Sequence, residues 1–524
     1  AMLDPAFYPE SPAEVAHRET HISHVFLAGE LAYKIKKNVR YSFVDYSTLA
    51  RRKYFLQEEL RLNRRLAPAV YLGILPISHD HYGWQLGSDA HPTEYVLVMR
   101  RLPERRMLDY LLERGQVTPR MMAAVAEILV PFHREAARSQ RKHPYGHSSS
   151  GQKIWQDNLA DIARLVGRTI DAEGFAAIRG FGERFLDERA ELMLRRAREG
   201  RARELHGDLH CEHICFAPEG IQIFDCVEFS PKLRFIDPAS EVAFLLMDLE
   251  ARGAKDLGAE FLRRYLELAD DRELPELLPF YQCYRALVRG KVYSLLSPDK
   301  ADRAGRYFDL AYSATWQEFK PFVVMICGLT GSGKSSLARA LARRLGAAVI
   351  SSDVLRKRLA GAPERREPAH FGEGIYGTAM TGRVYRKMIE KAERHLAAGE
   401  GVILDGTFQK AAQRAAVLET AAKYGAPVAI VYCHSREELI RERLQRRAAE
   451  GRDVSDGDWQ IYLKQKNLFE TITESALPRL ALDTESPVVE LSRDAERFLR
   501  ATFAKNRNET ASHSSQLNQL AEDR

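Results

Sequence analysis

Features typical of secreted, membrane-spanning or strongly nucleic-acid-binding proteins are scarce in this sequence of 524 residues. Its six cysteines are too few and too scattered for a disulfide framework, so free or buried thiols are expected. Apolar runs such as "FVVMICGL" at 322–329 are far shorter than the ~20 residues that span a bilayer. The formal net charge of +6 is small for this length, so bulk charge does not favour a nucleic-acid partner.

The first residues, "AMLDPAFYPESPAE", have neither a basic start nor an apolar core, so no secretory signal is visible. A cytoplasmic location is therefore expected. Hydrophobic residues make up 45% of the chain, enough at this length to bury more than one core.

The pattern of apolar residues changes twice along the chain. Residues 1–105 contain strand-like runs around one helical segment, which predicts an antiparallel sheet with an inserted helix. Residues 106–315 carry long amphipathic segments and predict a helical lobe. In 320–505 strands alternate with helices, which predicts a parallel sheet with helices on both faces. The polar residues 506–524 predict a disordered tail. The expected fold class is a multidomain combination of α+β and α/β.

A glycine-rich stretch, "GLTGSGKS" at 328–335, lies between an apolar strand and an amphipathic helix. This context is the one that a phosphate-binding loop requires, because glycines let backbone amides turn toward phosphates at a helix N-terminus. Lys334 is expected to reach the outer phosphates and Ser335 to hold Mg²⁺. The residues predicted to bind nucleotide here are Gly328, Gly331, Ser332, Gly333, Lys334, Ser335 and Ser336.

Charged residues follow two later strands and one helix of this region. Asp353, after "VISS", is predicted to orient or deprotonate a hydroxyl acceptor, and the alternative is a helix N-cap. Asp405, in "VILDG", is predicted to bind the water shell of the metal ion. Arg443 or Arg447, in "RERLQRRAAEG", is predicted to neutralise charge on the transferred group, and the alternative is an ordinary basic surface helix.

With these features, residues 322–500 resemble the P-loop kinases of small molecules and polynucleotide ends, such as gluconate kinase, chloramphenicol phosphotransferase, zeta toxin and the polynucleotide kinase domain. The resemblance implies phosphoryl transfer from ATP to a hydroxyl group rather than mechanical ATPase work.

The stretch "HGDLHCEHIC" at 206–215 is dense in potential metal ligands. A zinc site would need a second Cys/His pair, and Cys211 and Cys215 have none at a recognised spacing. Phosphoryl transfer explains more of the residues. Asp208 would accept a hydroxyl proton, and Asp225 in "IFDCVEF" would hold Mg²⁺ against the phosphates of ATP.

Together with the preceding sheet lobe, this stretch resembles the aminoglycoside phosphotransferase family, whose signature is His-Gly-Asp-x-His-x-x-Asn followed by an aspartate on the next strand. The resemblance implies a bilobal, protein-kinase-like domain over 1–315, with Asp208 as catalytic base and Asp225 as metal ligand. His213 stands where the family has asparagine. Because imidazole prefers softer metals than Mg²⁺, metal binding is expected through Asp225 alone, through water, or with Mn²⁺.

The same resemblance implies a lysine–glutamate pair beside the ATP phosphates. The lysine is Lys34 or Lys36, which share one strand face, and the glutamate is Glu59 or its neighbour Glu58. The alternative is a solvated lysine edge. The backbone around Met99, in "EYVLVMRRLPE", is expected to be the hinge that binds adenine.

The sequence thus predicts a bifunctional ATP-dependent phosphotransferase that uses ATP and Mg²⁺ and acts on small hydroxylated molecules. Two alternatives stay open: an N-terminal ligand-sensing pseudokinase that controls the C-terminal kinase, and a C-terminal kinase of polynucleotides or nucleotide sugars. No membrane partner is expected, and neither the acceptor nor the oligomeric state is predicted. The expected catalytic residues are Asp208, Asp353, Arg443 and Arg447, and the expected metal ligands are Asp225, His213, Ser335 and Asp405.

Overall fold

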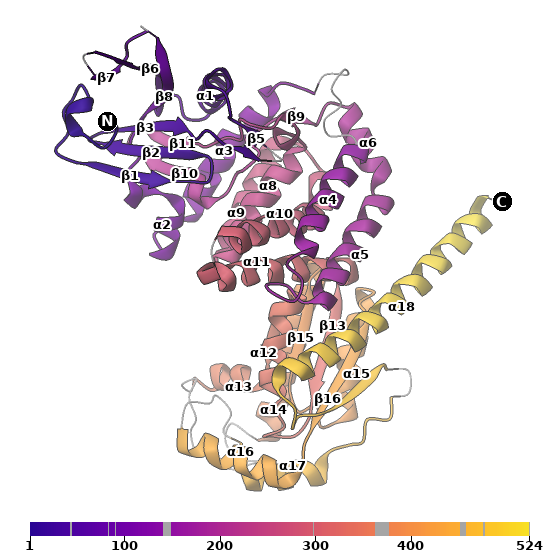
Figure 1. Ribbon diagram of the computed structural model, residues 1–524. Helices are drawn as coiled ribbons and strands as arrows, with labels where there is room; N and C mark the ends of the chain where they lie inside the picture. Colours follow the sequence, from indigo (N-terminus) through magenta and orange to yellow (C-terminus); the bar gives the residue numbers. More distant parts are fainter. Residues whose placement is uncertain are drawn as a thin grey trace. The chain divides into compact units, whose positions relative to one another are not determined.

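The computed structural model in Figure 1 divides into an N-terminal unit, Ala1–Ala311, and a C-terminal unit, Tyr312–Arg524. The boundary lies within helix α11 (Ala301–Ala314). The structure describes residues 1–41, 44–81, 83–89, 91–139, 148–296, 298–361, 377–450, 457–474 and 477–522, without the side chains of 148–150, 298 and 508–522.

The N-terminal unit begins with a six-stranded antiparallel sheet in the order β1-β2-β3-β8-β6-β7. The tight β2–β3 turn contains Gly29, which has a positive φ of 60° that glycine adopts without strain. The register places Lys34 opposite Val25 on one side and Leu97 on the other, in the middle of the sheet. The strands are β1 (Val15–Glu19), β2 (Ser23–Ala28), β3 (Leu31–Lys36), β6 (Tyr71–Asp80), β7 (Gly83–Leu86) and β8 (Pro92–Arg100).

A single helix, α1 (Leu49–Asn63), packs against β6 and β8 of this sheet. The Thr48 hydroxyl caps its first turn by accepting from the Arg51 amide at 3.3 Å. Leu56 on the helix is buried together with Tyr71 and Leu97 of the sheet. This packing fixes the helix phase and turns Glu59 toward the sheet, where its side chain is fully buried.

The rest of the N-terminal unit is mainly helical. Its central helix, α8 (Pro238–Ala251), is buried on all sides from Pro238 to Leu249 and packs against α9 and α10. The hairpin of β10 (Ile214–Ala217) and β11 (Gly220–Ile223) follows the short 3₁₀ turn Cys211–His213. The other helices are α2 (Leu108–Glu113), α3 (Pro119–Glu135), α4 (Ser148–Ala163), α5 (Ala172–Glu188), α6 (Ala190–Arg198), α7 (Pro231–Arg234), α9 (Lys255–Ala269) and α10 (Leu274–Leu296).

The C-terminal unit is built on a five-stranded parallel sheet in the order β14-β15-β13-β16-β17. Every residue of the central strand β13 is buried, as expected for a strand covered on both faces. The strands are β13 (Phe322–Cys327), β14 (Ala348–Ser351), β15 (Gly401–Asp405), β16 (Val428–His434) and β17 (Arg479–Asp483).

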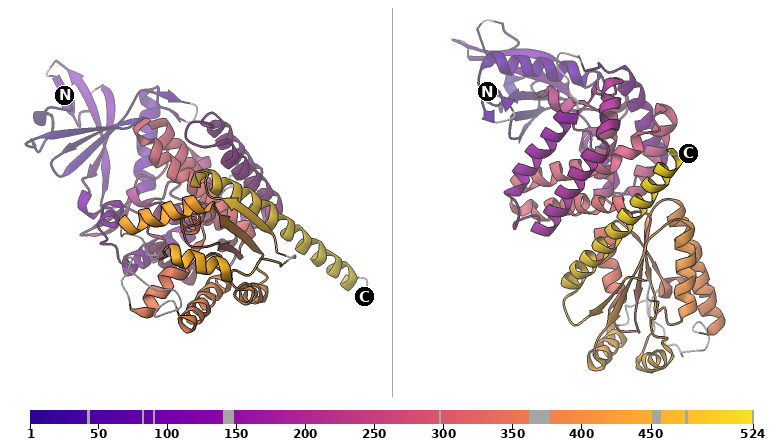
Figure 2. Two further views of the ribbon diagram at one scale, coloured as in Figure 1. Left: turned by 90° about the horizontal axis from the view of Figure 1, so that it is seen from below. Right: turned by 90° about the vertical axis from the view of Figure 1, so that its right-hand side faces the viewer.

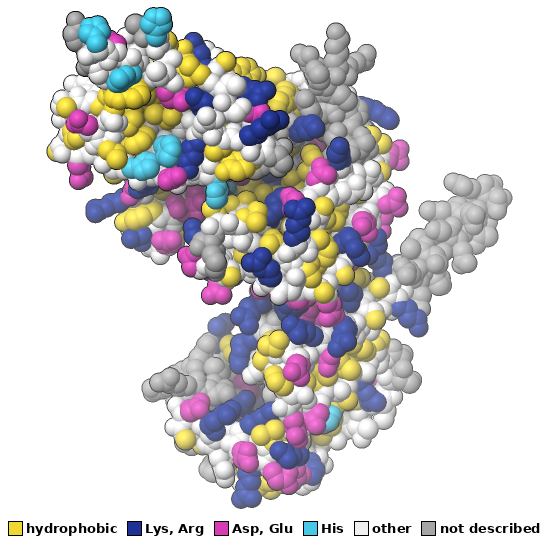
Figure 3. Space-filling view, viewed as in Figure 1, with side chains coloured by type: hydrophobic (Ala, Val, Ile, Leu, Met, Phe, Trp, Pro, Cys, Tyr) yellow, Lys and Arg dark blue, Asp and Glu magenta, His cyan; other side chains and the backbone are white. Residues whose placement is uncertain are grey.

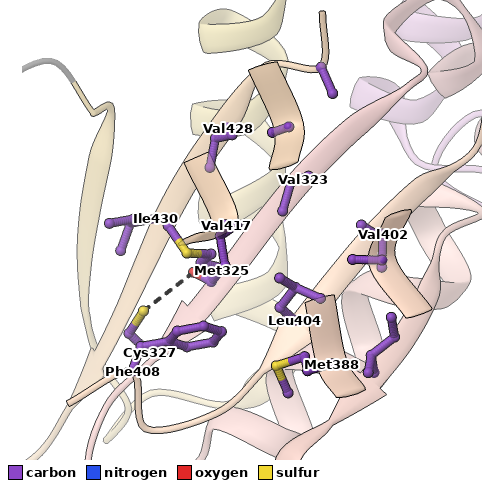
Figure 4. Close-up of a cluster of buried hydrophobic side chains, with 14 of the residues drawn as sticks. Val323, Met325, Cys327, Met388, Val402, Leu404, Phe408, Val417, Val428 and Ile430 are labelled. Atoms are coloured by element: carbon purple, nitrogen blue, oxygen red, sulfur yellow. Dashed lines mark hydrogen bonds between the residues drawn. The ribbon is translucent and has the colours of Figure 1, made fainter. Parts of the chain in front are cut away.

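Helices cover both faces of this sheet. Figure 2 shows the yellow helix α18 on one side and the orange helix α15 on the other. Helix α18 packs with α12, and α14 packs with α15. On the α14–α15 face, Val323, Met325 and Cys327 of β13 join Met388 and Val417 in one buried cluster (Figure 4). The helices are α12 (Lys334–Leu345), α13 (Ser352–Ala360), α14 (Thr378–Ala397), α15 (Ala411–Lys423), α16 (Glu437–Glu450), α17 (Trp459–Leu468) and α18 (Val488–Glu522).

The predicted fold class is confirmed, since an antiparallel sheet with one helix precedes a helical lobe and a parallel α/β sheet forms the second unit. One difference concerns the polar C-terminal tail at 506–524. Helix α18 runs to Glu522 and includes most of the segment that composition predicts to be disordered.

Candidate active sites

Two lysines of β3 share one buried glutamate in the N-terminal unit. Lys34 Nζ lies 2.7 Å from Glu59 Oε1, and Lys36 Nζ lies 2.5 Å from Glu59 Oε2. The two lysines lie on one face of the strand because side chains repeat every two residues. Lys36 also contacts Glu228 at 2.5 Å, whereas Lys34 alone of the two contacts Asp225, at 2.9 Å. Both lysines therefore pair with Glu59, and Lys34 is the one that reaches the aspartate.

Glu58, the other candidate partner, faces away from the lysines. Its carboxylate pairs with Arg61 at 2.9 Å and with Arg234 at 3.4 Å. The helix phase of α1 thus selects Glu59 for the lysine pair.

Lys34 and Asp225 hold each other in the charged state. Burial lowers the pKa of Lys34, but Asp225 and Glu59 outweigh this effect and raise it well above its usual value. Burial raises the pKa of Asp225, but Lys34 and His213 outweigh it and leave it below the usual value. Asp225 has a positive φ of 64°, and its amide donates to the Tyr71 hydroxyl at 3.2 Å. A strained residue held by such contacts is a common feature of functional sites.

The loop that carries Asp208 is held by the ring of His206. His206 Nε2 donates to the Phe224 carbonyl at 2.8 Å, and its Nδ1 accepts from the Asp208 amide at 3.3 Å. The ring therefore ties the loop to the segment that precedes Asp225. This geometry agrees with the predicted orienting, non-reactive position of His206.

Glu241 of α8 is a buried carboxylate that was not predicted from the sequence, and it binds the backbone of the same loop. Its two oxygens accept from the amides of His206 at 3.2 Å and Gly207 at 3.0 Å. It also contacts His133 at 3.2 Å, and Arg285 donates to the Gly207 carbonyl at 2.9 Å. The available signal in the sequence was a glutamate within the mainly apolar run "PASEVAFLL".

Replacing Glu241 with glutamine is expected to lower the free energy of unfolding by about 2–4 kcal/mol, because an amide NH₂ would face backbone N–H donors in a buried site. Urea unfolding of the full chain measures the loss. The matched control Glu260→Gln changes an exposed carboxylate on α9 that pairs with Arg263 at 2.6 Å, and should leave the transition midpoint unchanged. Equal midpoints for Glu241→Gln and the parent protein would contradict the structural role.

Asp208 and Asp225 contact the same imidazole, that of His213. His213 Nδ1 lies 2.9 Å from the Asp208 carbonyl oxygen and 3.7 Å from its carboxylate, and Nε2 lies 3.6 Å from Asp225 Oδ2. Burial raises the pKa of Asp208, but His210, His213 and Arg289 outweigh it and leave an ionised carboxylate. The two aspartates thus lie on either side of one imidazole ring, and the Asp208 side chain is 34% exposed.

In the stretch 206–215, the side chains that lie close enough together to bind one metal ion are those of histidine and aspartate, not of cysteine. Within the described part of the chain, the group of three with suitable spacing is Asp208, His210 and His213, whose ligand atoms lie within 4.8 Å of one another. Burial raises the pKa of Cys211 well above its usual value and that of Cys215 to about 11. Neither cysteine belongs to the group of three, so the side chains placed to share one ion are a carboxylate and two imidazoles.

Met99, the predicted adenine hinge, lies in β8 opposite Ala32 of β3 and Tyr71 of β6. The next two amides, of Arg100 and Arg101, donate to protein carbonyls at 2.8 Å each. The hinge role stays a prediction.

The glycine-rich loop of the C-terminal unit joins β13 to α12. Gly328, Gly331 and Gly333 have positive φ values of 142°, 79° and 80°. The Ser332 hydroxyl, 1% exposed, has no hydrogen-bond partner among the described atoms. A buried donor of this kind, in a loop that opens a helix, suits an anion such as a phosphate. The other predicted loop residues, Gly328, Gly331, Gly333, Lys334, Ser335 and Ser336, lie in the same loop and the first turn of α12.

Lys334 begins α12, and its Nζ donates to the Leu329 carbonyl at 2.7 Å. Burial lowers the pKa of Lys334, and nearby Asp405 and Asp353 oppose this effect. Lys334 and the carboxylates of Asp405 and Asp353 therefore interact electrostatically, as expected for residues of one site.

Ser335 and Asp405 form a buried pair of oxygen donors. The Ser335 hydroxyl donates to Asp405 Oδ2 at 2.8 Å, and Asp405 is 3% exposed at the end of β15. Burial raises the pKa of Asp405. Hydroxyl and carboxylate oxygens are the ligands that Mg²⁺ prefers, so these residues fit that ion.

The residues predicted to orient the acceptor and to neutralise charge on the transferred group lie on helices that follow the strands. Asp353 is in the first turn of α13, one turn before the buried Arg356, which donates to Thr381 at 3.2 Å. Arg443 of α16 donates to the Thr484 hydroxyl at 2.9 Å, and Arg447 lies one turn further along. The glycine-containing loop after α16, at 451–456, lies outside the described residues.

Alanine at position 328 is expected to disrupt the loop. Its Cβ would lie 2.3 Å from the Cys433 carbonyl oxygen and 2.8 Å from Ser332 Oγ, at a φ that side chains rarely adopt. Gly328→Ala should lower both thermal stability and ATP affinity, measured by calorimetry. The control Gly382→Ala, in α14 with open space around its Cβ, should stabilise the chain by about 0.5–1 kcal/mol. Unchanged ATP affinity in Gly328→Ala would refute the predicted role of the loop.

Comparison with known proteins places these two sites in families. The model of the phosphotransferase enzyme family matches residues 33–280, and an AAA domain model matches residues 323–472. An uncharacterized protein of Mycobacterium tuberculosis is 33% identical over 443 residues, which are 84% of this chain and 87% of that protein. The chain belongs to the family of this mycobacterial protein. It is an ATP-dependent phosphotransferase in which a phosphotransferase-family domain precedes a P-loop kinase domain, as its resemblance to aminoglycoside phosphotransferases and P-loop kinases predicted.

Other similar proteins include an uncharacterized protein of Mycobacterium bovis, with the same identity and coverage. Among solved structures, a gluconokinase from Sinorhizobium meliloti is 22% identical and covers 35% of this phosphotransferase and 94% of its own chain, with a TM-score of 0.26. The Mycobacterium tuberculosis APS kinase CysC in complex with AMPPNP and APS is also 22% identical and covers 34% and 98%, with a TM-score of 0.26. No helix in the described residues has the length and apolar character needed to cross a membrane.

Proposed function

We propose that this phosphotransferase has two active sites, each of which transfers the γ-phosphoryl group of ATP to a hydroxyl group of a small-molecule acceptor. One site lies within 1–315 and the other within 320–505. The contact of Asp208 and Asp225 with one imidazole, beside a Lys34 that pairs with Glu59, carries the proposal for the N-terminal site. The buried Ser335–Asp405 pair behind Lys334 supports the second site.

In the N-terminal site, the Asp208 carboxylate takes the proton of the acceptor hydroxyl as the oxygen attacks the γ-phosphorus. A new P–O bond forms to the acceptor, and the bond from the γ-phosphorus to the bridging oxygen of ADP breaks. Lys34 holds the phosphates, and the backbone around Met99 binds adenine. Asp225 and His213 hold a divalent cation, which supplies charge neutralisation on the phosphate oxygens when bound.

In the C-terminal site, Asp353 orients or deprotonates the acceptor hydroxyl, and Lys334 holds the outer phosphates within the glycine loop. Arg443 or Arg447 balances the charge on the departing ADP. Ser335 and Asp405 hold Mg²⁺ or its water shell, which neutralises phosphate charge.

Small metabolites are the proposed acceptors rather than nucleic acid. Figure 3 shows basic and acidic side chains interspersed over the visible face of each unit, with no broad surface of one sign. A protein that binds the phosphate backbone of a nucleic acid would be expected to have a broad basic surface. With ATP as donor and metabolites as acceptors, we place the reaction in the cytoplasm.

One observation favours a second candidate function for the N-terminal unit. His213 occupies the position where oxygen ligands of Mg²⁺ are expected, so a site that binds a ligand without turnover would serve as a sensor for the C-terminal kinase.

A metabolite screen tests the proposal. The full chain is incubated with ATP, Mg²⁺ or Mn²⁺, and pools of hydroxylated metabolites, and mass spectrometry detects products that gain one phosphoryl group. The variants Asp208→Asn and Lys334→Met assign each product to a site. If Lys334→Met removes products and Asp208→Asn removes none, the result supports the sensor function of the N-terminal unit. A complete absence of phosphorylated product across the pools would contradict both active sites.

A further inference from the structure

The ring of His213 has a fixed orientation between the two aspartates of the N-terminal site. Its Nδ1 lies 2.9 Å from the Asp208 carbonyl oxygen, which accepts hydrogen bonds and never donates them. Nδ1 therefore carries the hydrogen. The other nitrogen, Nε2, is left with its lone pair in the neutral ring, and it lies 3.6 Å from Asp225 Oδ2.

An electron pair of the ring thus faces a carboxylate oxygen. The ring is 14% exposed, and its centroid lies 4.0 Å from that of His210, which contacts the Arg289 guanidinium at 3.3 Å. A divalent cation between Nε2 and Oδ2 satisfies both atoms, because 3.6 Å is less than twice the ~2.1 Å length of a bond to a divalent metal.

The geometry selects this position over the neighbouring cluster of Asp208, His210 and His213. In that cluster His213 Nδ1 is already donating to a carbonyl, and His210 Nδ1 accepts from the Glu212 amide, so His210 Nε2 carries the hydrogen of its neutral ring. On the Asp225 side, Lys34 binds the other carboxylate oxygen, Oδ1, at 2.9 Å and leaves Oδ2 available.

We propose that the N-terminal site binds a nitrogen-accepting divalent ion of the Mn²⁺ type through His213 Nε2 and the Asp225 carboxylate, in preference to Mg²⁺. This inference deepens the proposed function and rests on it for the role of the ion. Mg²⁺ is a hard cation that favours oxygen ligands, whereas imidazole raises affinity for later divalent metals. Mn²⁺ accepts imidazole nitrogen and phosphate oxygen together, which a metal–ATP complex at this site requires.

Pulsed electron paramagnetic resonance of Mn²⁺ with a non-hydrolysable ATP analogue tests the site in the full chain. An imidazole ligand adds a nitrogen modulation to the Mn²⁺ signal. The C-terminal site contributes none through the oxygen ligands Ser335 and Asp405, so the modulation reports the N-terminal site alone. The parent protein should show it, and His213→Asn should abolish it and lower the Mn²⁺ to Mg²⁺ affinity ratio on the order of 10–100-fold.

Two control variants sharpen the result. His395→Asn changes a histidine of the C-terminal unit that pairs with Glu400, and should keep the modulation. His210→Asn should also keep it, and loss of the modulation in His210→Asn but not in His213→Asn would overturn the proposal in favour of the neighbouring cluster. Absence of nitrogen modulation in the parent protein with Mn²⁺ bound would overturn it outright.

The same samples separate this inference from the proposed function. Nitrogen modulation without an Asp208-dependent product would support the metal site and contradict N-terminal catalysis. An Asp208-dependent product formed equally well with Mg²⁺ and Mn²⁺, without modulation, would support catalysis and contradict the metal site.

Discussion

Lys334→Met is expected to lower the rate of C-terminal phosphoryl transfer by about 10²–10³-fold, the usual cost of removing one preorganised donor to a developing charge. Lys334 is the first residue of α12, and its ammonium group lies in the glycine loop near Asp405 and Asp353. Methionine keeps most of the unbranched apolar stem but removes the charge, so the loop should stay packed while the phosphates lose their cation.

The measurement is the initial rate of formation of the C-terminal product, with the N-terminal product as an internal control in the same tube. The matched variant Lys387→Met removes a lysine on α14 that pairs with Glu390 at 2.7 Å on the surface, and should leave both rates unchanged. A C-terminal rate within twofold of the parent in Lys334→Met would show that the glycine loop serves a purpose other than phosphoryl transfer.

The local parts of the two sites could be predicted from sequence because their residues are contiguous. The strand β13, the glycine loop and the first turn of α12 all lie within 322–337, so spacing alone indicates the geometry. The same holds for the loop that carries Asp208. The alternating and helical apolar patterns likewise indicated the fold class, since each period reflects one buried face.

The choices that sequence left open depend on contacts between distant segments. Two-residue periodicity placed Lys34 and Lys36 on one face but could not show which of them meets Asp225, 191 residues away. That outcome depends on how the segment after β11 packs on the sheet, where the Asp225 amide donates to the hydroxyl of Tyr71 in β6. The choice of Glu59 over Glu58 depends on the phase of α1, which Leu56 sets by burial against the sheet.

Supporting residues were the least predictable part. Glu241 supports the Asp208 loop from a central helix, and Glu228 pairs with Lys36, yet neither belongs to a recognised motif. A charged residue in an apolar run was the available signal for Glu241. The hydrogen-bond partners of Glu241 could not be predicted, because a buried carboxylate requires a donor but does not indicate which residue supplies it.

Asp208→Asn is expected to lower the rate of N-terminal phosphoryl transfer by about 10²–10⁴-fold, the range that a positioned general base contributes. Asparagine has nearly the same shape as aspartate but cannot accept the acceptor proton. The contacts that hold the loop should survive, because His213 bonds the backbone carbonyl of residue 208 and His206 bonds its backbone amide.

This separation of side-chain from backbone contacts makes the result specific. In Asp208→Asn, kcat should fall while the KM for ATP and the thermal stability stay near those of the parent protein. Asp225→Asn should instead weaken ATP and metal binding, since Asp225 contacts both Lys34 and His213. Glu219→Gln, in the exposed turn between β10 and β11, is the matched control and should change none of these quantities.

The pattern across the three variants also decides between catalysis and sensing. If the N-terminal unit is a sensor, Asp208→Asn leaves every product rate unchanged, while Asp225→Asn weakens ligand binding and alters the rate of the C-terminal reaction. If it is a catalyst, Asp208→Asn removes one product and leaves the C-terminal product intact. Asp208 and Asp225 lie on opposite sides of the His213 ring, so each can be replaced without removing the other's contacts. Comparing the product rates and ligand affinities of the two variants therefore shows whether a proton is transferred in this site.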